Sequence, residues 1–269
     1  MPEFVSMLIL AVVQGLTEFL PVSSSGHLVL FQALLGTREG DVFFDVILHL
    51  GTLGSVLVVY RREAARLLRL DRPALGYLAS LAVGTLPAVA VGLLAKDAIE
   101  AVFASPTFAA AGLLLTAAVL VSTRAARPAP AVPGRTDEPW EPRPVASWRA
   151  LVIGCAQAVA ILPGVSRAGS TIAASLWTGL ERAEAARFSF LLSVPAILGA
   201  LVLHLADGTG RASAVSPTEL ASLAAAAVAA FAVGLLAIRW TALAVVQAHF
   251  WKFSGYCLVV GVVVLLVLR

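Results

Sequence analysis

Long apolar runs recur along the chain and restrict its fold more than any other feature. Each run approaches the ~20 residues that an α-helix needs to cross a bilayer. Only 13% of the residues are charged, against roughly 25% in soluble domains. We therefore expect an all-α polytopic membrane protein with six full transmembrane spans: Phe43–Tyr60, Ala74–Ala95, Phe108–Thr123, Phe188–Ala206, Thr218–Ile238 and Gln247–Leu268.

The two halves of the sequence match at one constant offset of 142 residues. Leu20-Pro21 corresponds to Leu162-Pro163, and the hexapeptide at 90–95 recurs at 232–237. Each half begins with two short apolar arms, which cannot cross alone and predict a re-entrant hairpin. Three spans follow in each half, so the second half should begin on the opposite face, as in an inverted-topology repeat. The predicted units are a first repeat at 1–123 with its hairpin at 4–35, a proline-rich linker at 124–148, and a second repeat at 149–269 with its hairpin at 149–180.

Basic residues are distributed unevenly over the predicted loops. One set of loops, which includes the linker, carries thirteen arginines, and the other set carries four basic residues. The positive-inside rule places the arginine-rich set in the cytoplasm. The N-terminus, the mouth of the first hairpin and the C-terminus should then face outward. The same distribution explains the net charge of +3 without a nucleic-acid partner.

Each predicted hairpin contains a polar stretch, at 14–27 and at 161–171. Glu18 and Arg167 are the only fully charged side chains within them. Ionisable groups at membrane depth are costly and usually mark a functional cavity. The alternative is an ion pair that only holds the two hairpins together. The number of hydroxyl groups around both residues favours a functional site.

The residues around the two hairpin tips predict an anion-binding cradle. Pro21 and Pro163 should end the entering helices, and the serines and glycines that follow can cap the next ones. Helix starts offer free N–H groups and the positive end of the helix dipole. With the fork of Arg167, two such starts suit a phosphate or pyrophosphate. The predicted substrate contacts are Ser23, Ser25, Gly26, Gly164, Ser166, Gly169, Ser170 and Thr171.

The first hairpin also carries the groups needed for bond cleavage. Ser24 can attack phosphorus as a nucleophile, and His27 lies one helical turn later with a pKa range suited to proton transfer. Glu18 can orient His27, act as the base itself or bind a divalent cation. Direct attack by water or by His27 is the alternative to a serine nucleophile.

The two polar stretches resemble the signatures of a known family. Gln14-x-x-x-Glu18 with Pro21-Val-Ser-Ser-Ser-Gly-His27, and Pro163-Gly-Val-Ser-Arg167-Ala-Gly-Ser-Thr171, look like those of the bacterial undecaprenyl-pyrophosphate phosphatases of the bacitracin-resistance type. The resemblance implies hydrolysis of the C55 lipid pyrophosphate to the carrier monophosphate of cell-wall synthesis, in the bacterial cell membrane. It also implies an outward-facing site, a divalent cation (Mg²⁺ or Ca²⁺) and a homodimer. By motif position, Gln14, Glu18, Ser24, His27 and Arg167 take the functional roles, with Glu18 as the candidate metal ligand.

Several points stay open at the level of sequence. Gln14 occupies a position that is Glu or Gln in the family pattern, which weakens a two-carboxylate metal site, and Ala168 replaces a serine. Asp45 and His49 share a helix face and are either a second layer around the site or an interfacial pair. A polyprenyl-phosphate transporter on the same scaffold is the rival function. A carrier, however, needs no nucleophile paired with a base.

Overall fold

A computed structural model describes residues 3–37, 41–95, 99, 102, 105–130, 139–206 and 216–267, without the side chains of Val42 and residues 203–206. The secondary structure within these residues is helical. The elements are α1 (Glu3–Phe19), α2 (Ser24–Leu35), α3 (Val42–Val59), α4 (Arg61–Leu67), α5 (Arg72–Leu94), α7 (Pro106–Ser122), η1 (Thr123–Ala125), α8 (Ser147–Val159), α9 (Arg167–Trp177), α10 (Arg182–Ala206), α11 (Pro217–Val246), η3 (Phe250–Lys252) and α12 (Phe253–Val267).

Within the described residues, five helical segments are long and apolar enough to cross a membrane, and the pair α3 and α4 makes a sixth candidate. These candidates fall on the six predicted spans, with three differences in detail. The chain bends by 79° between α3 and α4, so the first span ends in a short arginine-rich helix. Helix α11 continues to Val246, past the predicted end at Ile238. The last span begins with the 3-10 turn η3 rather than with regular helix.

The described helices follow the same order in both halves. The short helices α1 and α2 precede α3, α5 and α7, and the short helices α8 and α9 precede α10, α11 and α12. The second arms begin at Ser24 and Arg167, within one residue of the sequence offset. Helix α8 begins at Ser147, so the second hairpin starts inside the predicted linker.

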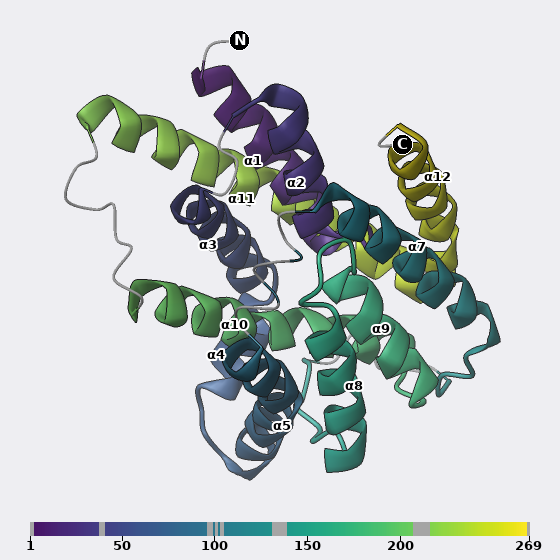
Figure 1. Cartoon of the computed structure of the whole chain (residues 1–269). Helices are drawn as coiled ribbons and strands as arrows, with labels where there is room; N and C mark the ends of the chain where they lie inside the picture. The colour runs from purple at the N-terminus through teal and green to yellow at the C-terminus, as the bar shows by residue number, and fades with distance from the viewer. Residues whose placement is uncertain are drawn as a thin grey trace.

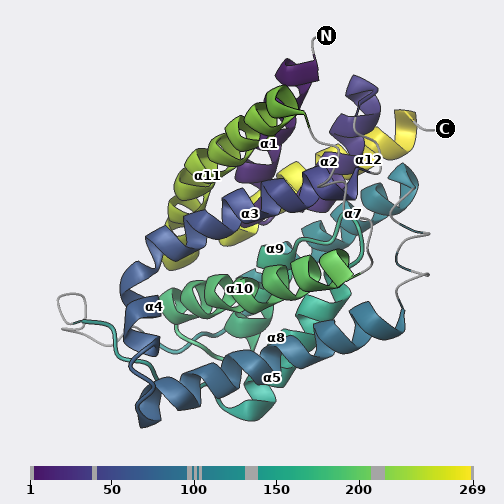
Figure 2. The same ribbon diagram turned by 90° about the vertical axis from the view of Figure 1, so that its left-hand side faces the viewer.

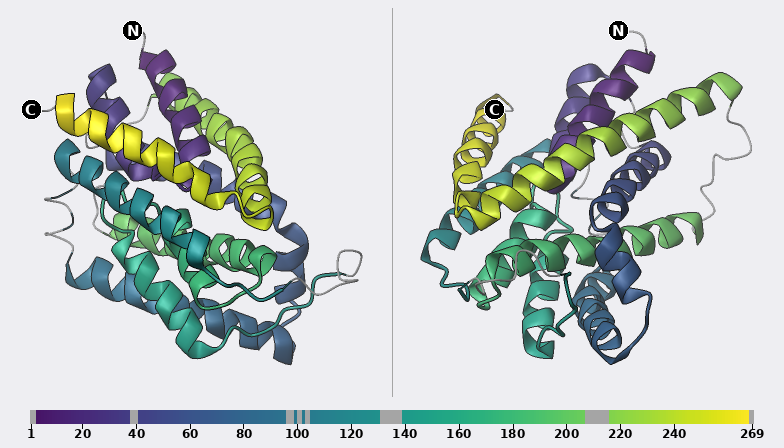
Figure 3. Two further views of the ribbon diagram at one scale, coloured as in Figure 1. Left: turned by 90° about the vertical axis from the view of Figure 1, so that its right-hand side faces the viewer. Right: turned by 180° about the vertical axis from the view of Figure 1, so that it is seen from behind.

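The two halves exchange helix contacts, because the first arm of each half packs on a helix of the other half. Helix α1 lies along α11, and α8 lies along α5, so the first arm of each hairpin packs on a long helix of the other half (Figure 1). Small residues permit this approach: a Cβ on Gly15 would lie 2.7 Å from the Ala230 carbonyl oxygen, and one on Gly154 would lie 2.5 Å from that of Gly84. Helix α12 lies alongside α7 (Figure 3). The halves therefore form one packed unit.

Apolar side chains are distributed as expected for a helical membrane protein. Aromatic residues such as Phe19, Tyr77 and Phe190 fill a buried cluster, in which Phe19 and Phe190 pack edge to face with ring centroids 5.8 Å apart. Helices α5, α11 and α12 also expose many large apolar side chains, among them Leu93, Val228 and Val259. Such faces suit contact with lipid rather than water.

The tips of the two hairpins meet inside the molecule (Figure 2). A Cβ built on Gly26, at the start of α2, would lie 2.9 Å from Cα of Gly164, which precedes α9. The backbone breaks of both hairpins are therefore in direct contact. This contact brings together the polar stretches that are far apart in the sequence.

Candidate active site

The first hairpin breaks between Phe19 and Ser24. Ser23 is the N-cap of α2, and its hydroxyl accepts a hydrogen bond from the Gly26 N–H at 3.3 Å. The backbone of Ser23 has φ +70°, in the left-handed region that non-glycine residues rarely adopt. A carbonyl group freed by the break finds a partner on a neighbouring helix, where Thr241 Oγ1 on α11 donates to the Phe19 oxygen at 3.0 Å. A break inside a membrane protein requires such compensation.

The second hairpin breaks in a related way. Ser166 caps α9 and accepts a hydrogen bond from the Gly169 N–H at 3.0 Å. Thr116 on α7 bridges the break, since its hydroxyl donates to the Gly164 oxygen and accepts from the Ser166 N–H, both at 2.9 Å. Gly164 has φ +83°, and a Cβ there would lie 1.9 Å from the Ala109 oxygen. Only glycine fits this position.

Glu18 lies at the centre of a polar cluster, called the Glu18 cluster below, that also contains Gln14, Ser24 and Arg167. Its Oε2 accepts hydrogen bonds from Ser24 Oγ at 2.5 Å and from Gln14 Nε2 at 3.0 Å. Its Oε1 forms an ion pair with Arg167 Nη2. The Glu18 side chain is only 4% exposed. A buried carboxylate is stable only when it is paired and hydrogen-bonded, and this cluster supplies both.

Arg167 and Ser24 are the first residues of α9 and α2. Both side chains reach the same carboxylate, so two helix N-termini converge on Glu18. Each helix start contributes unpaired N–H groups and about half a positive charge. The arrangement is a positive, donor-rich environment with one carboxylate and one hydroxyl at its centre. Such an environment suits a phosphate group.

His27 is held by groups other than Ser24. Its Nδ1 lies 2.8 Å from the Ser23 carbonyl oxygen, and its Nε2 lies 2.8 Å from Tyr256 Oη. The His27 and Tyr256 rings stack at 5.6 Å with an interplanar angle of 12°. A carbonyl oxygen can only accept, so Nδ1 carries a proton and the neutral ring accepts the tyrosine hydroxyl at Nε2. The proton acceptor that contacts Ser24 is therefore Glu18 and not His27.

The other predicted residues shape the two breaks. Ser25 Oγ lies 3.3 Å from Ser23 Oγ, and a Cβ on Gly169 would press on Ser166 at 3.0 Å. Ser170 is buried one turn into α9. The Thr171 hydroxyl donates to the Arg167 carbonyl oxygen at 2.8 Å within the same helix. The described contacts thus join Gln14, Glu18, Ser24 and Arg167 directly, and leave the remaining candidates in supporting positions.

Two residues outside the two polar stretches, His49 and Tyr256, also belong to the site. His49 Nε2 lies 3.6 Å from Glu18 Oε2, whereas the Asp45 side chain accepts a hydrogen bond from Gln32 Nε2 at 3.0 Å. The two residues that the sequence paired on one helix face do contact each other, since His49 Nδ1 lies 2.7 Å from the Asp45 carbonyl oxygen. His49 is the one whose side chain lies beside the Glu18 carboxylate. Tyr256 was not predicted. It lies 229 residues from His27, and only the packing of α12 against α7 brings it near.

The donor atoms beside Glu18 can be compared with the needs of a divalent cation. No group of three or more His, Cys, Asp or Glu suited to a metal gathers among the described residues. Gln14 Oε1 is nevertheless buried without a hydrogen-bond partner, on the amide whose nitrogen bonds to Glu18. Magnesium is commonly held by one or two carboxylates together with substrate phosphates. The residues present therefore fit a cation that is shared with a phosphorylated ligand.

Comparison with known proteins gives one consistent result. Residues 7–263 match the family described as the bacitracin resistance protein BacA. A protein of Rhodopirellula baltica is 40% identical over 99% of this chain and 98% of its own length, and one of Desulfatibacillum aliphaticivorans is 39% identical over 98% of both. A third, from Korarchaeum cryptofilum, is 36% identical over 98% of both. All three are named undecaprenyl-diphosphatase.

Proposed function

Because this chain belongs to the family of the bacitracin resistance protein BacA, we propose that it is a membrane-embedded undecaprenyl-diphosphatase. It hydrolyses undecaprenyl diphosphate to the monophosphate and inorganic phosphate, which recycles the lipid carrier of cell-wall synthesis. The observation that carries the mechanism is the 2.5 Å hydrogen bond from Ser24 Oγ to Glu18. It pairs a nucleophile with a base at the point where Arg167 and two helix N-termini converge.

Substrate binding begins with an exchange of partners at Arg167. Without substrate, its guanidinium neutralises the buried Glu18 carboxylate. An entering diphosphate offers more negative charge and a bidentate acceptor, which the guanidinium fork prefers. Arg167 then binds phosphate oxygens and loosens its hold on Glu18. The carboxylate gains basicity when the substrate is in place.

The reaction follows from this change. Glu18 takes the proton of Ser24 as Oγ forms a bond to the terminal phosphorus. The bond from that phosphorus to the bridging oxygen breaks, and the lipid monophosphate leaves as an anion. Water then attacks the phosphoserine, and the Ser24 Oγ–phosphorus bond breaks as Glu18 returns its proton to Oγ. Inorganic phosphate is released and carries the protons of the water. Arg167 and the N–H groups of the helix starts stabilise charge on the transferring group in both steps.

A divalent cation, Mg²⁺ or Ca²⁺, is part of the proposal. Glu18 and the unpartnered Gln14 Oε1 would hold it, together with phosphate oxygens of the substrate. The cation would neutralise negative charge on the diphosphate. The single carboxylate implies that the cation binds with the substrate rather than before it.

The orientation in the membrane is likewise a proposal. We infer an inverted-topology repeat in the bacterial cell membrane, with the active site open to the outer face. The thirteen-to-four bias of basic residues supports this orientation, and the exchanged packing of α1 with α11 and α8 with α5 supports a two-fold relation of the halves. A homodimer is carried over from the family resemblance as a prediction.

Phosphate release from undecaprenyl diphosphate by the purified protein tests the function. Glu18→Gln should lower kcat about 10²- to 10⁴-fold, the usual contribution of a general base. Ser24→Ala should lower kcat at least as much, because it removes the nucleophile. Ser222→Ala is the control, because its hydroxyl donates to the Thr218 carbonyl oxygen on α11 and takes no part in the site. Full turnover of Ser24→Ala would remove this serine from the mechanism. Transport of the lipid across the membrane without any phosphate release would instead support the transporter.

A further inference from the structure

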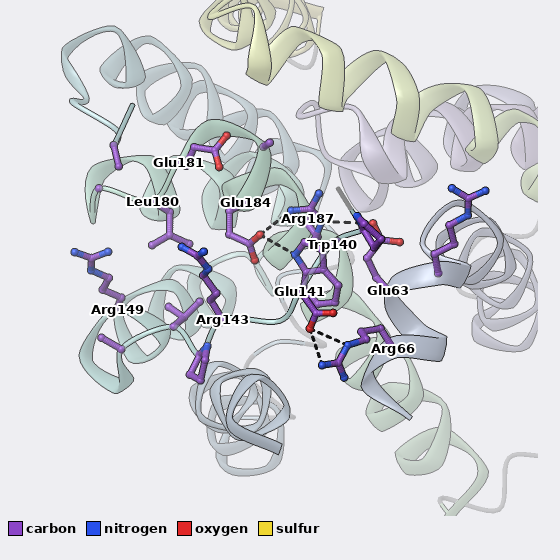
Figure 4. A pocket seen from close by; sticks show the side chains of 18 of the residues that line it. Glu63, Arg66, Trp140, Glu141, Arg143, Arg149, Leu180, Glu181, Glu184 and Arg187 are labelled. Atoms are coloured by element: carbon purple, nitrogen blue, oxygen red, sulfur yellow. Dashed lines mark hydrogen bonds and ion pairs between the residues drawn. The ribbon is translucent and has the colours of Figure 1, made fainter. Parts of the chain in front are cut away.

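A cavity of about 1260 Å³ lies apart from the Glu18 cluster, between α4, the linker, the start of α8 and the start of α10 (Figure 4). Its walls are unusually rich in charge for a protein with so few charged residues. Six arginines and four glutamates line it: Arg62, Arg66, Arg69, Arg143, Arg149, Arg187, Glu63, Glu141, Glu181 and Glu184. Gln14, Glu18, Ser24 and Arg167 are not among the lining residues. The cavity is therefore a separate site.

Part of this charge is neutralised within the cavity wall. Glu184 accepts hydrogen bonds from Arg187 at 2.7 Å and from Tyr77 at 2.8 Å. Glu141 accepts two from Arg66, at 2.6 and 2.9 Å. Figure 4 shows the bonds of Arg187 to Glu184 and of Arg66 to Glu141, together with the ion pair of Arg187 and Glu63 and the Trp140 Nε1 bond to Glu184 at 3.3 Å. They account for two arginines and three glutamates.

Four lining arginines remain without an ion pair to any described carboxylate: Arg62, Arg69, Arg143 and Arg149. Among the described lining residues, Glu181 is the one carboxylate without an ion pair, so this described lining has an excess of positive charge. Arg149 Nε is buried and has no hydrogen-bond partner. A buried donor without a protein partner calls for a water, an ion or a ligand as its acceptor. Guanidinium groups recognise phosphate by parallel N–H···O bonds.

The surroundings of Arg149 point to a phosphate carried by a lipid. Trp148 is 58% exposed next to it, and the Arg149 guanidinium lies 5.4 Å from that ring. Leu151 and Val152 continue the exposed apolar face along α8. Tryptophan prefers the level of the headgroups, and an apolar helix face beside it suits an acyl chain. We propose that the cavity binds the phosphate headgroup of an anionic phospholipid, with Arg143 and Arg149 as its ligands.

The test compares two double variants of equal charge. Arg143→Gln/Arg149→Gln removes two cavity arginines, and Arg61→Gln/Arg239→Gln removes two exposed arginines that do not line the cavity. Phosphatidylglycerol and phosphatidylcholine are titrated into the detergent-solubilised full chain, and bound lipid is counted by native mass spectrometry. Sodium phosphate is titrated separately by calorimetry. Every protein also carries Arg167→Ala, which removes the main phosphate ligand of the active site.

We expect the cavity variant to bind phosphatidylglycerol at least 10-fold more weakly than its parent, and the control variant to bind it as the parent does. Phosphatidylcholine should bind weakly to all three. Equal binding of phosphatidylglycerol by the cavity and control variants would show that the cavity is not the lipid-binding site. Binding of sodium phosphate at the cavity arginines without binding of the lipid would overturn the lipid assignment.

Three measurements separate this proposal from folding and from the proposed function. Arg143→Lys/Arg149→Lys retains the charge and should recover part of the lipid affinity, whereas an unfolded protein would not. Melting temperatures of all variants check the fold. With Arg167 intact, the cavity variant should hydrolyse undecaprenyl diphosphate in detergent at the parent rate, because the cavity shares no lining residue with the Glu18 cluster.

Discussion

At the scale of single residues, the placement of His27 is the most informative feature of the site. Its two ring nitrogens are held by the Ser23 carbonyl and by Tyr256 Oη, so the ring is fixed in one tautomer beside the first break. The Ser24 proton has a closer acceptor in Glu18. We therefore propose that His27 acts on the geometry of the helix start that would bind phosphate, and that Tyr256 is a positioning residue for it.

Removing the Tyr256 hydroxyl tests this role. Tyr256→Phe keeps the stacked ring and loses one hydrogen bond, which is worth about 0.5–1.5 kcal/mol. We expect kcat to fall about 3- to 10-fold with KM nearly unchanged, measured by phosphate release under saturating substrate. Tyr77→Phe is the matched control, since its hydroxyl donates a bond of the same 2.8 Å length to Glu184 outside the site. Unchanged kcat in Tyr256→Phe would show that the contact has no part in positioning His27.

The sequence was informative about the site where the chemistry is local. Glu18, Ser24 and Arg167 stand out because charge and hydroxyl groups are rare in apolar segments, and the structure joins all three. The sequence could not assign the proton acceptor of Ser24, because His27 and Glu18 are both near in sequence and only side-chain geometry distinguishes them. Tyr256 could not be found at all, since an aromatic residue in an apolar helix carries no signal of its own.

At the scale of elements, the second break and the end of α2 depend on glycine for different reasons. Gly164 has φ +83° and faces the Ala109 carbonyl oxygen, whereas Gly36, which caps α2 with φ +61°, has open space where a Cβ would lie. Gly36→Ala should therefore cost only the left-handed strain, about 1–2 kcal/mol, and a melting temperature a few degrees lower. Gly164→Ala adds a backbone clash and should prevent recovery of folded protein. Equal melting temperatures for the two variants would contradict this account of the second break.

The linker is attached to α4 by an electrostatic contact that titrates. The Arg66 guanidinium hydrogen-bonds to Glu141 and holds the pKa of that carboxyl below its ordinary value of 4.5. A lowered pKa means that the contact stabilises the folded state above pH 4.5 and that this stability is lost as the pH falls through the lowered value. Hydrogen exchange at 139–146, corrected for the intrinsic pH dependence, should therefore accelerate in acid.

Glu141→Gln provides the control for this pH effect. The uncharged amide should give fast exchange at 139–146 already at neutral pH, and the acid-dependent acceleration should disappear. An unchanged acid response in this variant would assign the effect to other groups. The sequence predicted an irregular, proline-rich linker here, but it could not show the attachment, because the partners Arg66 and Glu141 lie 75 residues apart.

At the scale of the whole molecule, the exchanged packing explains how the two polar stretches come together. Each hairpin has its broken backbone satisfied by a long helix of the other half: Thr241 on α11 at the first break, and Thr116 on α7 at the second. The internal offset in the sequence indicated two similar halves, and their element order agrees with it. The exchange itself was not predictable, since the apolar faces of α5 and α11 carry no information about their partners.

The proposed orientation requires that the open ends of the two hairpins lie on opposite membrane faces. Leu34, near the end of α2, and Trp177, at the end of α9, are both exposed and mark these ends. Single cysteines at these positions, in a Cys155→Ser background that retains the buried Cys257, are treated with a membrane-impermeant maleimide. Leu34→Cys should react in intact spheroplasts, and Trp177→Cys only after permeabilisation.

A third position separates the two parts of that proposal. Leu68→Cys, in the exposed turn after α4 within the arginine-rich segment, should react only after permeabilisation if the positive-inside assignment holds. Labelling of Leu34→Cys and Trp177→Cys from the same side would exclude an inverted repeat whatever Leu68 does. Opposite sides, but with Leu68→Cys reactive in intact cells, would keep the repeat and reverse the molecule. The Glu18 cluster would then lie near the end of a path that starts in the cytoplasm, and the proposed recycling of the carrier on the outer face would have to be abandoned.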